Sequence, residues 1–149
     1  MTKIVNINIK KLNDNAIVPT RGSNYAAGYD LYANITKPIT ILPHYTAKIG
    51  TGIAMEIPEG YFGGIFARSG LATKYGLRPS NCVGIIDSDY RGEIIVALHN
   101  DSNLLQEIRL NERIAQLVLI PFIAINFNTV NELSDTERSD GGFGSTGLK

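Results

Sequence analysis

Short apolar segments place the strongest constraint on the fold of this chain. Ile, Val, Tyr and Thr dominate them, Gly or Pro interrupts them about every 8–12 residues, and no stripe with a period of about 3.6 residues persists over three turns. Many short strands with turn-rich connections predict an all-β barrel, sandwich or jelly roll. The segments expected to form strands are 3–12, 39–43, 47–58, 61–67, 82–87, 92–100 and 113–127.

Two regions fall outside this strand pattern. Residues 69–76 (SGLATKYG) are the one candidate for a short helix, with Ser69 as its N-cap and Gly76 as its stop. Residues 131–149 are polar and rich in Gly, Asp and Ser. We therefore expect a β-rich domain over 1–130 and a C-terminal arm over 131–149.

Composition limits the classes of partner. The chain has 149 residues and a formal net charge of +0, with 44% apolar and 19% charged residues, which is typical of one globular domain. Its 14 Lys and Arg residues are scattered, with no cluster denser than Lys10 and Lys11, so no nucleic-acid partner is expected. No apolar run has the length of a signal peptide or membrane span, so no membrane contact is expected.

Cysteine and histidine are too few for a disulfide or a metal centre built from these residues. Cys82 is the single cysteine, and His44 and His99 are the only histidines. A reducing compartment, and hence the cytoplasm, fits best.

Polar and small residues gather in two stretches within the first 77 residues. In AAGYDLYA (26–33), Asp30 stands between aromatic and apolar residues, so it needs a partner if buried; a turn in which it accepts backbone N–H groups is the commoner arrangement. In ARSGLATKYGL (67–77), Arg68, Ser69 and Gly70 offer a guanidinium, a hydroxyl and free N–H groups to phosphate oxygens. The alternative is a plain cap at Ser69 and a surface ion pair at Arg68.

The stretch NCVGIIDSDYRGEI (81–94) is the most informative. Asp87 follows an apolar burst, so we expect it at a pocket wall, where a carboxylate could orient or deprotonate a water. Asp89 precedes Tyr90 and Arg91 and is typical of a turn residue that pairs locally. A simple hairpin turn is the alternative for the whole stretch.

Two further stretches complete the set. Gln116 lies in the apolar run of NERIAQLVLIP (111–121), either as a satisfied core amide or as a ligand donor. The C-terminal GGFGSTG suggests phosphate contact, although Leu148 stands where a Walker loop needs lysine; a frayed terminus is the alternative. Together the stretches favour a phosphorylated small molecule as ligand.

In this order, the stretches resemble the five motifs of the trimeric dUTP diphosphatase (dUTPase) family. AAGYDLYA, ARSGLATKYGL, NCVGIIDSDYRGEI, NERIAQLVLIP and RSDGGFGSTG correspond to motifs one to five, over residues 26 to 147. Three positions depart from the pattern: Ala67 replaces proline or glycine, and Asn111 and Ser139 each replace glycine. Asn tolerates a left-handed backbone better than most residues.

The resemblance implies an all-β, jelly-roll-like (β-clip) barrel with one short helix and a flexible C-terminal arm. It also implies a homotrimer with shared active sites that hydrolyses dUTP to dUMP and pyrophosphate, limiting uracil in DNA and supplying dUMP for dTMP synthesis. By this resemblance Asp87 activates the water that attacks the α-phosphorus, and Tyr90 packs under the deoxyribose. Residues assigned to the uracil edge are Asn81, Gly84, Ile85 and Ile86.

The remaining roles concern the phosphates and the arm. The resemblance assigns the phosphates to Arg68, Ser69, Gly70 and Gln116. Mg²⁺ bridges phosphate oxygens without direct protein ligands, and Asp30 supports an arginine or metal-bound waters. In the arm, which closes as a lid, Phe143 stacks on uracil and Arg138 reaches the γ-phosphate, while the phosphates are wrapped by Gly144, Ser145 and Thr146.

Two alternatives remain. A dCTP deaminase of the same fold needs a different carboxylate near the base, and residues 81–90 and the tail fit it less well. A non-catalytic protein that uses nucleotide occupancy to switch a partner is the second alternative, against which the intact Asp87 argues.

Overall fold

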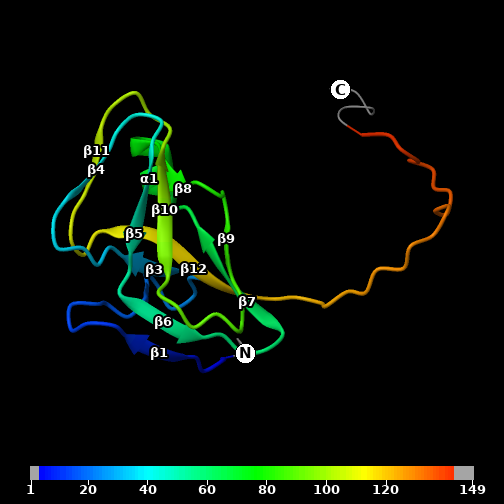
Figure 1. Ribbon diagram of the computed structural model, residues 1–149, viewed down its shortest axis with the longest axis horizontal. Helices are drawn as coiled ribbons and strands as arrows, with labels where there is room; N and C mark the ends of the chain where they lie inside the picture. The colour runs from blue at the N-terminus through cyan, green and yellow to red at the C-terminus, as the bar shows by residue number, and fades with distance from the viewer. Residues whose placement is uncertain (1–3, 143–149) are drawn as a thin grey trace.

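The computed structural model describes residues 4–142, which form four antiparallel sheets and one short helix (Figure 1). The largest sheet has the strand order β2 (Thr20–Arg21), β3 (Tyr29–Tyr32), β12 (Arg113–Pro121), β7 (Tyr61–Phe66) and β9 (Gly84–Ile86). A second sheet has the order β5 (Thr46–Gly50), β10 (Ile95–Asn100) and β8 (Leu77–Pro79). The two remaining pairs are β1 (Asn8–Lys11) with β6 (Ile53–Glu56), and β11 (Gln106–Ile108) with β4 (Ile39–Ile41).

One apolar core joins these sheets. Along β10, Val96 and Leu98 are buried while Ile95, the first residue of the strand, is exposed, as expected when alternate side chains face the core. Apolar residues with no exposed surface come from several sheets and the adjoining loops: Leu31, Ala33, Ile49, Ile53, Ile94, Leu98, Ile114 and Ala115. The all-β, jelly-roll-like fold with one short helix is therefore confirmed.

Several strand predictions were wrong in extent. The single strand expected over 47–58 is two strands in different sheets, β5 and β6, because the chain turns between them at Gly52, which has φ 67°. The strand expected over 113–127 ends at Pro121, because Pro121 lies opposite Tyr61, the first residue of β7, and no neighbouring strand continues beyond it. The strand expected over 3–12 is confined to Asn8–Lys11, where β6 provides a partner. The short strands β2, β3, β8 and β11 were not predicted, since two to four residues carry no visible periodicity.

The helix α1 (Ser69–Tyr75) begins differently from the expectation. Arg68, with φ −84° and ψ 129°, is the N-cap, and no side chain caps the helix. The carbonyl of Arg68 already accepts the N–H of Ala72 at 3.0 Å, so Ser69 is the first helical residue and its predicted N-cap role is wrong. The stop at Gly76 is confirmed, with φ 68° in the left-handed region.

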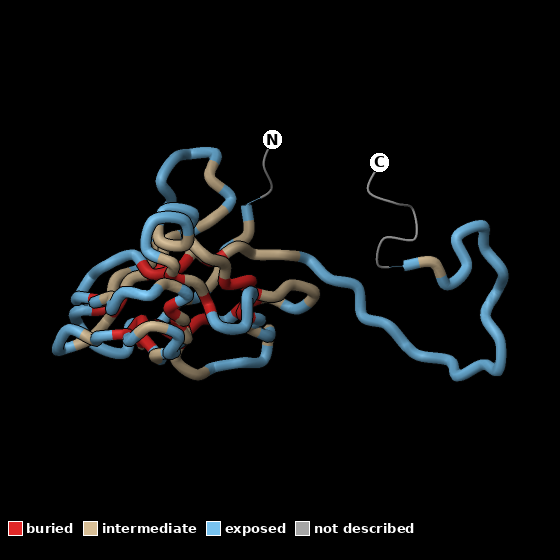
Figure 2. Tube along the Cα trace, turned by 90° about the horizontal axis from the view of Figure 1, so that it is seen from above, coloured by how far each residue is buried: buried red, intermediate tan, exposed pale blue. Residues whose placement is uncertain are grey.

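The chain leaves the sheets after β12. Residues 122–142 contain no strand or helix and run away from the body of the molecule (Figure 1), almost entirely exposed (Figure 2). The division into a domain over 1–130 and an arm over 131–149 stays a prediction. Within residues 4–142, no helix is long and apolar enough to cross a membrane.

Candidate active site

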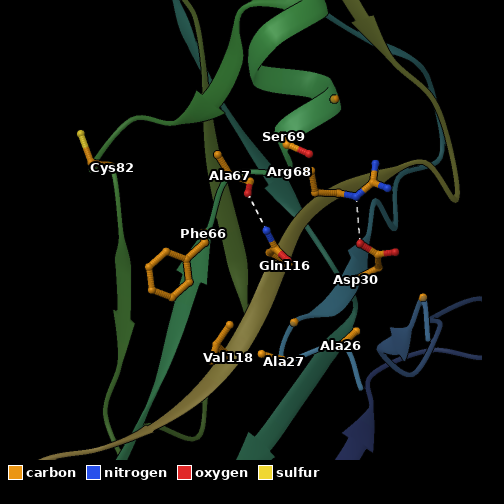
Figure 3. Close-up of a pocket in the computed structure, with 13 residues that line it drawn as sticks. Ala26, Ala27, Asp30, Phe66, Ala67, Arg68, Ser69, Cys82, Gln116 and Val118 are labelled. Atoms are coloured by element: carbon orange, nitrogen blue, oxygen red, sulfur yellow. Dashed lines mark hydrogen bonds and ion pairs between the residues drawn. The ribbon is translucent and has the colours of Figure 1, made fainter. Parts of the chain in front are cut away.

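The central strand β12 brings three sequence stretches together. Gln116 lies opposite Asp30 on β3 and opposite Phe66 on β7. Residues directly opposite one another on antiparallel strands share a face of the sheet. Nε2 of Gln116 donates to the carbonyl of Ala67 at 2.8 Å, which ties β12 to the segment that enters α1 (Figure 3). Gln116 is thus a half-buried amide at a sheet face rather than a core residue.

Asp30 holds two arginines. Nε of Arg68 donates to its Oδ1 at 2.8 Å (Figure 3), and Nη1 of Arg113 donates to its Oδ2 at 3.3 Å. Asp30 lies on β3 and not in a turn, so the reading in which it accepts turn N–H groups is wrong. Nη1 of Arg68 also donates to the carbonyl of Arg113 at 3.4 Å, so the plane of the guanidinium is fixed and Nη2 keeps a defined direction toward a ligand.

A hollow of about 770 Å³ opens beside this ion pair. Its wall contains all four residues expected to hold phosphates, Arg68, Ser69, Gly70 and Gln116. Ser69 and Gly70 are exposed, and the start of α1 presents backbone N–H groups next to them. The hollow therefore combines a positioned cation, a hydroxyl and amide donors, which is a donor set suited to phosphate oxygens.

A second hollow, of about 190 Å³, lies beside β9. Its wall contains Ile85, Ile86, Asp87 and Tyr90, together with Glu93 and Ile95. The N–H of Tyr90 donates to the carbonyl of Asp87 at 3.2 Å, so residues 87–90 form a turn and Asp87 and Asp89 are not on a common strand face. The hydroxyl of Tyr90 donates to the carbonyl of Glu93 at 2.9 Å, which fixes the ring in the hollow.

Asn81 lies on the turn that leads into β9, and Gly84 is the first residue of that strand. A Cβ atom at Gly84 would be 3.6 Å from Nδ2 of Asn81 and 3.1 Å from Cβ of Ile65, so the glycine allows close packing at this point. Asn81 is exposed, while Gly84 is buried. Neither residue is in the wall of either hollow.

Within the described residues, the expected site is divided between two hollows that share no wall residue. The phosphate set is assembled in one and the Asp87 set in the other. Arg138 lies on the exposed arm, where its Nε donates to the carbonyl of Gly141 at 2.8 Å. The remaining arm residues fall outside the described part of the chain: Phe143, Gly144, Ser145 and Thr146.

Several wall residues were not singled out from the sequence. Val118 follows Gln116 by two positions on a strand, so strict alternation from Gln116 would have found it. Phe66 stands two positions before the Arg-Ser-Gly stretch, and Cys82, on the turn between β8 and β9, also lines the phosphate hollow (Figure 3). Glu93 and Ile95 enter the second hollow and carried no sequence signal of their own.

The three departures from the family pattern have structural counterparts. Asn111 has φ 65° and Ser139 has φ 50°, so both replace glycine where the backbone is left-handed. Ala67 contributes its carbonyl to the Gln116 bond, an interaction that its side chain does not affect.

Comparison with known proteins follows the same stretches. A dUTPase family model matches residues 14–147. The chain is 50% identical over 141 residues to the deoxyuridine 5′-triphosphate nucleotidohydrolase of Nautilia profundicola, covering 95% of this chain and 98% of that protein. The protein of the same name from a Hydrogenobaculum species is 45% identical over 141 residues, covering 95% and 97%.

Solved structures agree with this relationship. A dUTPase of Staphylococcus bacteriophage 80alpha with dUPNHPP has a TM-score of 0.87 at 31% identity, covering 96% of this chain and 99% of that one. A mutant dUTPase of S. aureus phage phi11, which coordinates a structural Mg(II) ion, has a TM-score of 0.79 at 25% identity, covering 88% and 100%. The family match over most of the chain and the relatives of nearly equal length establish that this chain belongs to the dUTPase family.

Proposed function

We propose that this chain is a dUTP diphosphatase, which hydrolyses dUTP to dUMP and pyrophosphate. The observation that carries the proposal is the 50% identity to a deoxyuridine 5′-triphosphate nucleotidohydrolase, of which 98% is covered. The donor set around Arg68 and the carboxylate at Asp87 support it chemically. The reaction limits uracil in DNA and supplies dUMP for dTMP synthesis, and the free, exposed Cys82 is compatible with a reducing cytoplasm.

Phosphate binding rests on the larger hollow. Arg68 presents its free N–H groups to phosphate oxygens while Asp30 fixes its orientation. Ser69, Gly70 and Gln116 add neutral donors on the same wall. Fixed donors of this kind stabilise charge that develops on the phosphates during attack, which is usually the largest contribution to catalysis.

Water activation rests on Asp87. Its carboxylate is exposed at the second hollow, where it can accept a proton from the water that attacks the α-phosphorus. The ring of Tyr90 is fixed by its bond to the carbonyl of Glu93, so it can pack under the deoxyribose and leave no space for a 2′-hydroxyl. The uracil edge falls to Asn81 and the backbone of Gly84, Ile85 and Ile86.

The same geometry supports the proposal of a homotrimer with shared active sites. One chain separates the phosphate set from the Asp87 set, and the second hollow has a strongly exposed apolar wall: Ile85 is 63% and Ile95 is 48% exposed. A shared site would place the phosphate hollow of one subunit against the Asp87 hollow of the next and would cover these side chains. The third contribution is the arm, with Arg138, Phe143 and residues 144–146 closing over the nucleotide.

Mg²⁺ fits this site as an ion held mainly by the substrate. Both carboxylate oxygens of Asp30 are occupied by arginines, and residues 4–142 contain no group of three or more His, Cys, Asp or Glu side chains arranged to hold a metal. Magnesium commonly binds through substrate phosphates and retained waters, and when bound it neutralises charge on the triphosphate. The protein's own contribution is to hold the phosphates with Arg68 and Gln116.

The test is hydrolysis of dUTP, dCTP, dTTP and UTP with Mg²⁺, in which pyrophosphate and ammonia are followed together. We expect pyrophosphate from dUTP alone. Asp87→Asn should lower turnover by at least about a thousandfold. Asp89→Asn is the matched control, because it removes the same charge from the same turn outside the hollow and should retain turnover.

Other outcomes would overturn the assignment. Ammonia from dCTP would identify a deaminase. Absence of reaction with all four nucleotides would favour a nucleotide-switched interaction protein. The phage 80alpha dUTPase belongs to a group that controls transfer of virulence genes by a G protein-like mechanism, so an Asp87→Asn protein that still binds dUTP is also the reagent with which to seek a partner.

A further inference from the structure

Arg78 on β8 forms a two-pronged ion pair with Asp101. Its Nε donates to Oδ2 of Asp101 at 2.7 Å and its Nη2 donates to Oδ1 at 3.1 Å. Such fork-to-fork pairing fixes the plane of the guanidinium as well as its position. The hydrogen bond that Arg78 donates to Asp101 raises the pKa of Arg78 above its ordinary value, so the guanidinium stays charged in any ordinary buffer.

Asp101 is a rigid support for this pair. It directly follows Asn100, a fully buried residue whose Nδ2 donates to the carbonyls of Ile41 at 3.0 Å and Leu104 at 2.7 Å. The N–H of Asp101 donates to the carbonyl of Gly76 at 2.8 Å. The backbone of Asp101 is therefore anchored to the core, and this fixes the position from which its carboxylate extends.

The third nitrogen of Arg78 contacts the turn over residues 80–83. Nη1 lies 3.2 Å from the carbonyl oxygen of Pro79 and 3.4 Å from that of Ser80, and 3.9 Å from Sγ of Cys82. One guanidinium thus connects the end of β10 to the turn between β8 and β9. Lysine has a single nitrogen and could not bridge both sides with the same geometry.

This turn has a backbone that needs such support. Cys82 has φ 63°, a left-handed conformation that is unfavourable for a residue with a Cβ atom. The N–H groups of Cys82 and Val83 donate to the carbonyls of Pro79 at 3.0 Å and Asn81 at 2.7 Å, so the turn is tight. Strained positions persist only where the surrounding structure fixes them.

We propose that Arg78, held by Asp101, is a positioning residue that keeps residues 80–83 in the conformation in which Asn81 meets the nucleotide base. The proposal rests on the proposed function for the identity of the ligand. It concerns the base end of the nucleotide, because the turn contributes Cys82 to the wall of the phosphate hollow but none of the residues assigned to the phosphates. Its loss should therefore weaken recognition of the nucleoside and leave pyrophosphate binding intact.

The test compares Arg78→Lys with a matched control, Arg109→Lys. Arg109 is an exposed arginine whose Nε donates to Oε1 of Glu107 at 2.7 Å, so it also forms an ion pair. Glu107 lies on β11, outside the turn over residues 80–83. We expect Arg78→Lys to raise KM for dUTP and the inhibition constant of dUMP about tenfold, with kcat and the inhibition constant of pyrophosphate within about twofold. Arg109→Lys should change none of the four. Asp101→Asn, which removes the charge on the support, should shift the same constants in the same direction.

Amide hydrogen exchange provides a second readout that does not need activity. In Arg78→Lys the amides of Cys82 and Val83 should lose protection, whereas the amide of Ile94, which donates to the carbonyl of Ile53 at 2.8 Å in the core, should not. Unchanged exchange at the turn, or equal weakening of dUMP and pyrophosphate binding, would overturn the proposal. If the unmodified protein fails to hydrolyse dUTP, the proposed function falls, and the exchange measurement still decides whether Arg78 holds the turn.

Discussion

A Cβ atom placed on Gly28 would overlap Oε1 of Gln116. Gly28 directly precedes β3, and Gln116 lies on the adjacent strand β12. Because Nε2 of Gln116 donates to the carbonyl of Ala67, the amide is enclosed between Gly28 and the segment that enters α1. The glycine therefore allows the close approach that keeps a phosphate-facing amide in place.

Gly28→Ala should lower kcat/KM for dUTP by at least about tenfold, because the added methyl group forces Gln116 away from its bond to Ala67. The measurement is steady-state pyrophosphate release from dUTP. Gly22→Ala is the matched control: Gly22 borders the same hollow, but nothing lies within 4 Å of a Cβ atom there. Equal activities of the two variants would mean that the contact between Gly28 and Gln116 has no part in turnover.

Asp30→Asn should impair both stability and activity. The amide keeps the size of the side chain but loses the charge that holds Arg68 at 2.8 Å and Arg113 at 3.3 Å. We expect the free energy of unfolding to fall by about 1 to 3 kcal/mol and kcat/KM by at least about tenfold, since the guanidinium at the phosphate hollow is no longer oriented.

Urea unfolding and steady-state kinetics together check this expectation. Asp14→Asn provides the control, because Asp14 is exposed. In the hydrogen bond described for it, Nζ of Lys11 donates to its main-chain carbonyl at 2.9 Å, and the substitution leaves that carbonyl unchanged. A stable Asp30→Asn protein with unaltered kinetics would remove the orienting role of Asp30.

The sequence predicted the type of fold because apolar alternation reports directly on which strand face is buried. Strand ends were harder to predict, because they depend on a partner: β12 stops where β7 begins, although apolar residues continue to Phe127. Asp30 and Arg68 were each recognised, but their pairing across 38 positions arises only when β3 and β7 flank β12. The separation into two hollows has the same origin, since sheet order determines it.

Local conformation was predictable where one residue type decides it. Gly76 ends the helix, and Asn111 stands in the left-handed region that asparagine tolerates. The cap could not be assigned in this way, because Arg68 extends from β7 into α1 and takes the position that a serine usually prefers. The link from Arg78 to Asp101 carried no local signal, since it joins the ends of two strands.

Asn111 allows a direct test of the left-handed backbone. With φ 65°, Asn111→Ala should lower the free energy of unfolding by about 1 kcal/mol, whereas Asn111→Gly should leave it within about 0.5 kcal/mol. The midpoints of urea unfolding, at unchanged m-values, provide the comparison. Asn24→Ala, at an exposed asparagine outside the left-handed region, controls for the loss of an amide side chain. An alanine variant as stable as the glycine variant would contradict the expectation.

Deletion of residues 138–149 should separate folding from turnover. The described hydrogen bonds of this region join residues close in sequence. For example, Nε of Arg138 donates to the carbonyl of Gly141, and the N–H of Ser139 donates to Oγ1 of Thr136 at 3.0 Å. The truncated protein should therefore unfold at a midpoint within about 2 °C of the full chain. Turnover of dUTP should fall at least about a hundredfold, because Arg138 and Phe143 are lost from the closing arm. Glu132→Gln, on the exposed arm outside the motif, should retain turnover. Full activity of the truncated protein would exclude a lid, whereas unfolding would show that the arm supports the sheets.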